Sequence, residues 1–287
     1  MRIRATVAAV TGALALSALV VPAAQAADSA PSYKAAAAKV LSHAGSGKSA
    51  FSSADEPADL GVTFSDLKIA SAIKVGTTNH VTTTVTYTMT HDANYVLGSD
   101  DFDNGPFIYK ESTGGILFGD APASCTATSA TVASCKGLID VYPADDELLN
   151  VDAGSWKAGA LAVQYSTGAG SETDALGTTL VQRYSKLTVN ASPEPVKKGK
   201  TITVTGKLSR ANWEDHQYHG YTKQSVQLQF RKKDSSTYTT LKTITSDSTG
   251  NLKTTTTAST DGYFRYAFAG TSTTPAVNAT GDFVDVQ

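Results

Sequence analysis

Hydrophobic and polar residues alternate most clearly over residues 81–90. Val81, Val85, Tyr87 and Met89 lie at odd-numbered positions there, and every even-numbered position is a threonine. A period of two in a segment rich in β-branched and aromatic residues predicts a β-strand with one buried face. Shorter patterns of the same kind predict strands at residues 62–69, 106–110, 116–118, 136–141 and 160–165.

A more regular set of strands is predicted in the last hundred or so residues. Val226, Leu228 and Phe230 alternate there with polar residues. The same pattern predicts strands at residues 187–191, 201–208 and 263–268. Gly- and Asn-containing turns separate the predicted strands of the first half, and residues 192–195 end the first strand of the second. Residues 145–151 predict a single helical turn.

Two local features of this second half carry more specific expectations. Residues 238–244 break the alternation, because Leu241 and Ile244 would face opposite sides of one strand, so we expect a β-bulge or an edge strand. Asp261-Gly262-Tyr263 at a strand entrance predicts a tyrosine corner, in which the tyrosine hydroxyl bonds to upstream main chain.

Short strands with turns between them and no long helix predict an all-β protein made of two tandem antiparallel β-sandwiches, the C-terminal one immunoglobulin-like. We expect these sandwiches to follow a signal peptide and a flexible leader that holds a short helix at residues 32–43. The predicted division is 1–26 for the signal peptide, 27–57 for the leader, 58–186 for the first sandwich and 187–287 for the second.

The first residues have the pattern of an export signal. Arg2 and Arg4 precede an uncharged apolar run at residues 5–21, and Ala24-Gln25-Ala26 supplies small residues at a cleavage site before Ala27. The alternative is a membrane anchor, for which the run is short. We therefore expect a secreted extracellular protein with no membrane anchor.

Charge divides the chain at the same place as the strand pattern. Residues 27–186 hold 10 Lys and Arg against 18 Asp and Glu, whereas residues 187–287 hold 12 against 8. The overall net charge of −2 is too small to indicate nucleic acid or a membrane surface as the partner.

Cys125 and Cys135 are the only two cysteines in the chain. In an oxidising compartment this pair predicts a disulfide bond that closes a short loop. A loop of that length corresponds to roughly 2–3 kcal/mol of stabilisation in the chain-entropy description.

Several runs of the second half resemble the bacterial immunoglobulin-like domains of secreted actinomycete proteins. The runs that carry the resemblance are 187–200, 204–208, Val226-Gln227-Leu228-Gln229-Phe230-Arg231, Asp261-Gly262-Tyr263-Phe264-Arg265 and 268–270. The resemblance implies the fold and a carrier or binding role. The first half is similar to domains of unknown function in the same kind of exported protein, on Cys125, Cys135 and the turn at residues 152–156, and this implies no catalytic residues.

Candidate catalytic residues do not form a recognisable motif. The chain has no G-x-S-x-G sequence, and none of its five histidines lies in a catalytic pattern. The sequence therefore favours a non-catalytic protein. A secreted hydrolase with dispersed active-site residues is the alternative.

The acidic segment at residues 100–105 is the candidate metal site. Asp100, Asp101, Asp103 and Asn104 supply oxygen ligands of the kind that calcium prefers, although the spacing does not match the helix–loop–helix calcium pattern. The segment therefore makes calcium a possible cofactor, with a calcium-stabilised structural protein as a further alternative. The other interpretation of the segment is a solvated turn.

The segment at residues 213–221 is the candidate ligand site. Trp213, Tyr218 and Tyr221 can form an aromatic platform for a sugar ring, and Asp215, His216 and His219 offer zinc ligands without a known spacing. The alternative is that Trp213 and Tyr221 pack over the end of the sandwich. Taken together, the sequence predicts a secreted binding or structural module for a surface, a cell-surface glycan or a protein.

Overall fold

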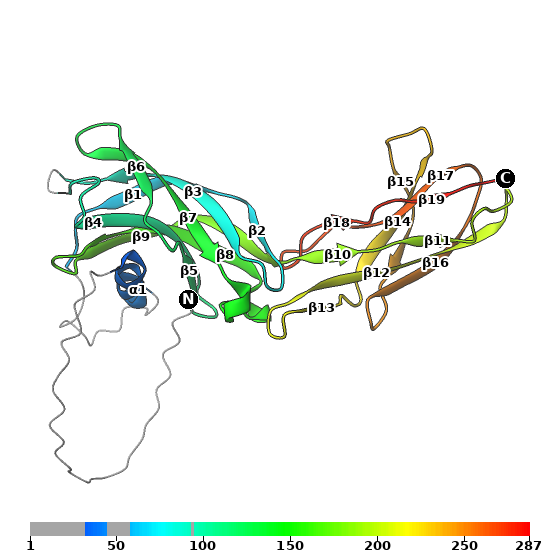
Figure 1. Cartoon of the computed structure of the whole chain (residues 1–287), viewed down its shortest axis with the longest axis horizontal. Helices are drawn as coiled ribbons and strands as arrows, with labels where there is room; N and C mark the ends of the chain where they lie inside the picture. Colours follow the sequence, from blue (N-terminus) through cyan, green and yellow to red (C-terminus); the bar gives the residue numbers. More distant parts are fainter. Residues whose placement is uncertain (1–31, 45–57, 93–94) are drawn as a thin grey trace, which may run out of the picture.

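A computed structural model describes residues 32–44, 58–92 and 95–287, so the predicted signal peptide and most of the predicted leader lie outside the described residues. Two β-sandwiches lie end to end, with one helix beside the first (Figure 1). The all-β fold with tandem sandwiches is therefore confirmed, and each half has a hydrophobic core of its own.

The first sandwich has one sheet of four strands and one of five. The four-stranded sheet has the order β1 (Thr63–Ile69), β3 (Val81–Thr90), β7 (Val132–Val141) and β6 (Ser124–Ala127). The five-stranded sheet has the order β2 (Ala72–Val75), β9 (Gly170–Arg183), β8 (Gly154–Gln164), β4 (Phe102–Lys110) and β5 (Gly115–Phe118).

Strand β3 has the predicted bounds and orientation. Val85, Tyr87 and Met89 are buried in the core between the sheets, and the threonines at even-numbered positions face outward because successive side chains point to opposite sides. Thr83, at an odd-numbered position, is buried with the apolar residues. The other predicted strands are present, but β4, β7 and β8 begin earlier than their patterns indicate. Apart from Phe102, Val132 and Trp156, their extra residues are small or polar, so their strand conformation depends on pairing with neighbours.

Two local predictions for the first sandwich need correction. Strands β2 and β9 pair in parallel, from Ala72 opposite Leu180 to Val75 opposite Arg183, so the five-stranded sheet is mixed. In place of one helical turn there are two short 3-10 turns, η1 (Pro143–Asp145) and η2 (Asn150–Asp152).

Helix α1 (Tyr33–Ala44) is present within one residue of its predicted position and packs on the five-stranded sheet (Figure 1). Its apolar residues recur at helical spacing and are buried. The cluster consists of Tyr33, Ala37, Val40 and Leu41 of the helix with Phe107, Phe118, Leu161 and Val163 of the sheet. The described part of the predicted leader is therefore a helix that packs on the sheet. The sequence predicted the helix, but its alanine-rich pattern did not indicate the packing.

The second sandwich also has two sheets. One is centred on β12 (Thr201–Asn212), which pairs with β10 (Ser185–Leu187), β11 (Asn190–Ser192), β13 (Gln217–Gly220) and β16 (Asn251–Thr257). The other has the order β15 (Thr239–Thr245), β14 (Ser225–Lys232), β17 (Gly262–Phe268) and β18 (Val277–Asn278), with β19 (Asp282–Val284) also on β17.

The irregularity predicted near residues 238–244 is confirmed. β15 lies at the edge of its sheet, and its register with β14 shifts at Leu241, between Lys242 opposite Leu228 and Thr240 opposite Gln229.

The two sandwiches are joined through a buried tryptophan. Trp213 follows β12 of the second sandwich, is 0% exposed, and belongs with Ala211 to the hydrophobic core of the first sandwich. Its indole N–H donates to the Gly76 carbonyl at 2.9 Å. The buried Arg183 donates through Nε to the Ala211 carbonyl at 2.6 Å, and burial, with Arg210 nearby, lowers its pKa to about 10. A side chain of one half thus completes the core of the other.

Candidate ligand-binding site

Strand alternation places a set of large polar side chains on the outer face of the sheet β15–β14–β17–β19. Val226 and Leu228 of β14 are fully buried against the other sheet, so Gln227, Gln229 and Arg231 face outward. On β17 the buried residues are Phe264, Tyr266 and Phe268, and the outward residues are Tyr263, Arg265 and Ala267.

The register between the two strands brings arginines against tyrosines. Arg231 lies directly opposite Tyr263, and its guanidinium is 3.8 Å from the centre of the Tyr263 ring. Arg265 lies 3.8 Å from the centre of the Tyr238 ring, and Arg231 is 5.4 Å from the same ring. The order across the face is Tyr263, Arg231, Tyr238 and Arg265. We name these four residues the arginine–tyrosine ladder.

Main-chain and amide groups hold both guanidiniums in place. Arg231 donates through Nη1 to the Ser235 carbonyl at 2.8 Å, and Arg265 donates through Nε to the Gln229 side chain at 2.9 Å. Neither arginine forms an ion pair with a carboxylate in the described part of the chain. Two positive charges are therefore fixed on a half-exposed face without a neutralising partner.

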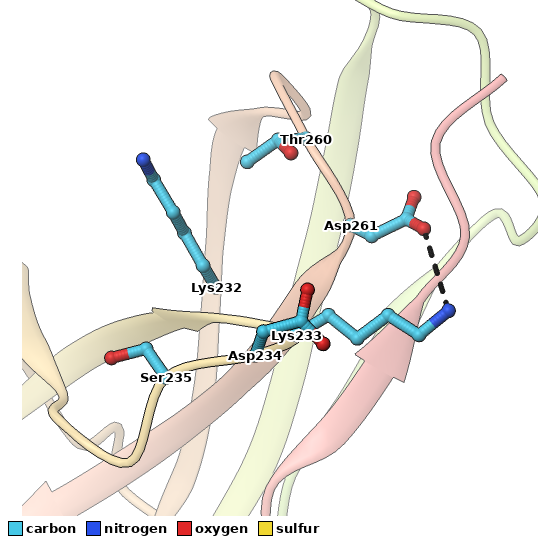
Figure 2. A pocket seen from close by; sticks show the side chains of 6 residues that line it. All are labelled: Lys232, Lys233, Asp234, Ser235, Thr260 and Asp261. Atoms are coloured by element: carbon cyan, nitrogen blue, oxygen red, sulfur yellow. Dashed lines mark ion pairs between the residues drawn. The ribbon is translucent and has the colours of Figure 1, made fainter.

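A depression of about 470 Å³ lies beside the end of β14 and the start of β17 (Figure 2). The turn after β14 and the residues before β17 form its walls, and its lining residues are Lys232, Lys233, Asp234, Ser235, Thr260 and Asp261. Lys233 reaches toward Asp261, 3.9 Å between Nζ and the carboxylate, while Lys232 extends in the opposite direction (Figure 2). Lys232 is exposed and forms no ion pair among the described residues.

The chemistry of this surface suits oxyanions. A guanidinium is planar and presents several N–H donors in a geometry that matches a carboxylate, a phosphate or a sulfate. Stacking on tyrosine fixes the plane of each guanidinium, and the N–H groups not used by Ser235 or Gln229 can donate to a ligand. The hydroxyls of Ser235 and Thr260 and the Gln229 amide add neutral groups that can bond to sugar hydroxyls.

The aromatic platform predicted at residues 213–221 is not formed. Trp213 is buried between the sandwiches, and Tyr218 packs at the edge of the first core under Lys186, which is 3.7 Å from its ring centre. Tyr221 packs instead on the core of the second sandwich, edge-on to Phe268. The three rings lie in three different environments because β13 folds back along β12. The alternative interpretation, in which these residues pack instead of binding a ligand, therefore describes the segment. Trp213 does not pack where that interpretation put it, since it is buried against the neighbouring sandwich.

The zinc interpretation of the same segment fails on geometry. His219 contacts Asp215 at 2.6 Å, whereas His216 is directed at the first sandwich, 3.0 Å from the Pro143 carbonyl. Among the residues that the structure describes, no three His, Cys, Asp or Glu side chains are grouped to hold a metal ion.

The acidic segment does not present its oxygens to one point either. β4 starts at Phe102, so Asp103 and Asn104 face opposite sides of a strand, and Asn104 is buried where it accepts a hydrogen bond from the Tyr87 hydroxyl at 2.6 Å. Asp100 precedes the strand. The candidate calcium ligands therefore point in different directions, because part of the segment is a strand where the sequence indicated a loop.

The two remaining carboxylates of that segment each have partners. Asp101 accepts hydrogen bonds from the Gln164 amide at 2.9 Å and from Ser166 at 2.7 Å, and these bonds lower its pKa. Asp103 accepts one from the Tyr165 hydroxyl at 2.6 Å, but its burial outweighs that bond and raises its pKa. Both groups link β4 to the end of β8.

The predicted disulfide is confirmed. Cys125 of β6 and Cys135 of β7 lie directly opposite each other in the antiparallel pair and are bonded. The bridge secures the edge strand β6 to the centre of the sheet.

Four of the five histidines have described side chains, and each of the four has a hydrogen-bond partner. The four whose side chains are described bond to an aspartate or a main-chain carbonyl: His80 to Asp140, His91 to the Asp92 carbonyl, His216 to the Pro143 carbonyl and His219 to Asp215. His80 also stacks on Tyr142, whose hydroxyl donates to Asp120 at 2.5 Å. This group lies beside α1, where Lys34 pairs with Asp120.

The ladder is the feature that sequence reasoning missed. The alternation in β14 and β17 already places Arg231, Tyr263 and Arg265 on outward positions, but the register that puts Arg231 on Tyr263 is not local. Tyr263 was expected to be a tyrosine corner. Its ring instead stacks under Arg231, and it is Tyr266 whose hydroxyl donates to upstream main chain, at the Val204 carbonyl.

Comparison with known proteins identifies no relative. No family description and no curated protein sequence matches the chain. Solved structures that resemble it include latent PorU from Porphyromonas gingivalis (11% identity, 78% of this chain and 20% of PorU, TM-score 0.27) and the adhesin InvE from Yersinia pseudotuberculosis (13%, 78% and 58%, 0.25). Fibronectin(III)-like modules of CbhA from Clostridium thermocellum are a third (12%, 77% and 92%, 0.29).

The chain spans a fifth of the length of PorU and somewhat over half of InvE. All three TM-scores are well below 0.5, so these likenesses carry no argument about function. Among residues 32–44, 58–92 and 95–287, no helix has the length and apolar character needed to cross a membrane.

Proposed function

We propose that the protein is a secreted, non-catalytic binding protein that holds its ligand on the outer face of the second sandwich. The single observation that carries the proposal is the arginine–tyrosine ladder, because Arg231 and Arg265 are positioned by stacking and carry charges that no carboxylate of the described chain neutralises. Fixing a charged donor in one plane before a ligand arrives lowers the entropy lost on binding.

Two further features support the proposal. The disulfide between Cys125 and Cys135 suits an oxidising, extracellular compartment, as does the export signal expected from residues 1–26. The first sandwich and the junction at Trp213 then act as a support that presents the ladder at a fixed orientation, because Trp213 is fully buried between the two cores.

Binding to an immobilised panel of neutral polysaccharides, acidic polysaccharides and extracellular proteins tests this function. We expect retention on at least one class, and at least about 25-fold weaker binding when Arg231→Gln and Arg265→Gln are combined, since two charge-assisted hydrogen bonds are lost. Lys207→Gln with Lys253→Gln is the matched control on the opposite sheet. Retention on no class, or release of new reducing ends or peptide termini from a bound ligand, would overturn the proposal.

A further inference from the structure

We infer that the ligand is an acidic polysaccharide, whose anionic groups contact Arg231 and Arg265 on the ladder and Lys232 at the depression next to it. This inference rests on the proposed function, since it names the ligand class for the same face. Four independent features of the face support it.

The first feature is charge. Arg231, Arg265 and Lys232 form no ion pair within the described residues, whereas Lys233 already has Asp261 at 3.9 Å. Asp261 is further engaged, because it accepts the Val286 N–H at 2.9 Å. Asp234 also lines the depression and is exposed, so the three available cations still outnumber the one carboxylate that has no ion pair there. An anionic ligand would supply the missing partners.

The second feature is the arrangement of these charges. Gln229 is opposite Arg265 and Arg231 is opposite Tyr263, so the two arginines are diagonal neighbours, about 7–8 Å apart along the sheet. Lys232, the last residue of β14, leaves the strand on the other side from Arg231 and lines the depression. The ladder adjoins that depression, because Arg231 donates to the carbonyl of Ser235, another of its lining residues. Three cations at separate positions match a polymer with repeated anions better than a single small anion.

The third feature is the neutral groups between the charges. Gln229 lies between the arginines, and Ser235 and Thr260 line the depression with hydroxyl groups. Sugars present many hydroxyls that need such donors and acceptors, and binding without them would leave polar groups unpaired.

The fourth feature disfavours a nucleic acid. Proteins that bind single strands stack bases on open aromatic rings, but guanidiniums lie over Tyr238 and Tyr263 at 3.8 Å. The ladder and Lys232 also supply fewer cations than a duplex-binding surface, which can make about 6–10 phosphate contacts.

Polygalacturonate is the probe, with dextran as the neutral comparison and dextran sulfate to separate carboxylate from sulfate recognition. We expect the complete mature chain to bind one or both acidic polymers and not dextran, and its affinity to fall with salt. Lys232→Gln should weaken binding about fivefold, and Arg265→Gln by at least as much. Lys253→Gln is the matched control, since Lys253 is an exposed cation on β16 of the opposite sheet.

Lys232→Gln alters an exposed side chain, so unchanged melting of this variant confirms that any loss is local. Equal binding to dextran, equal loss in the Lys253→Gln control, or equal binding to duplex DNA would overturn the acidic-polysaccharide assignment. If dextran binds equally well, or if a protein ligand binds through the ladder, the proposed binding function stands and only the ligand class is wrong. Retention on none of the polymers or proteins overturns both.

Discussion

The second sandwich has two aromatic-rich regions, residues 213–221 and the arginine–tyrosine ladder, and they differ in how far their rings are buried. Trp213 is fully buried and completes the core of the first sandwich, whereas Tyr238 and Tyr263 stay half-exposed with arginines on their rings. The first region has the more conspicuous sequence. The second has the geometry of a binding surface.

The difference shows that aromatic content alone does not indicate a ligand site. A tryptophan at the end of a sandwich removes a large apolar area from water if a second domain can cover it. Tyrosines on the outward positions of a sheet have no such cover, so they pack against the nearest long side chains, here Arg231 and Arg265. Three experiments test whether the first region is structural and the second functional.

Separation of the two sandwiches should have the largest effect. A fragment of residues 185–287 keeps β10 and the core of the second sandwich, so we expect cooperative unfolding and a β-type circular dichroism spectrum. Trp213 is its only tryptophan, since the other is Trp156, and it should emit at longer wavelength than in the full chain because its cover is gone. An unfolded fragment, or unshifted emission from a folded one, would contradict the junction described above.

Truncation of the junction side chain should have the next largest effect. Trp213→Ala removes a fully buried tryptophan and should lower the free energy of unfolding by about 3–5 kcal/mol, measured by urea denaturation of the full chain. Trp213→Phe is the matched control. It keeps a ring but leaves the Gly76 carbonyl without its donor, so we expect about 1–3 kcal/mol. A loss below 1 kcal/mol for the alanine variant would show that the sandwiches do not depend on each other.

Truncation in the ladder should have the smallest effect on stability. Tyr263→Ala removes a partly exposed ring and its stacking on Arg231, so we expect the free energy of unfolding to fall by only about 1 kcal/mol. Ligand binding should weaken in the same variant, because Arg231 loses the ring that fixes its plane. The comparison between the two regions would be wrong if Tyr263→Ala destabilised the protein as much as Trp213→Ala and left binding unchanged.

Several properties of this protein are determined by the sequence alone, because each depends on residues that are close in the chain. The alternation at residues 81–90 and in Val226-Gln227-Leu228-Gln229-Phe230-Arg231 fixes both strand conformation and which side chains face outward. The irregular alternation around Leu241 predicts a register shift at the sheet edge. Two cysteines and no others leave one pairing for a disulfide.

Only the tertiary structure decided which outward residues meet and which buried surface covers an aromatic side chain. Arg231 reaches Tyr263 because β14 and β17 pair in one register, and a shift of one residue would put different side chains opposite each other. Trp213 is buried in the core of the first sandwich, where the Gly76 carbonyl, 137 positions earlier in the chain, accepts its indole N–H. Asn104 turned inward because β8 extends the strand through the acidic segment. These outcomes depend on contacts between distant parts of the chain, and no local pattern of hydrophobic and polar residues encodes them.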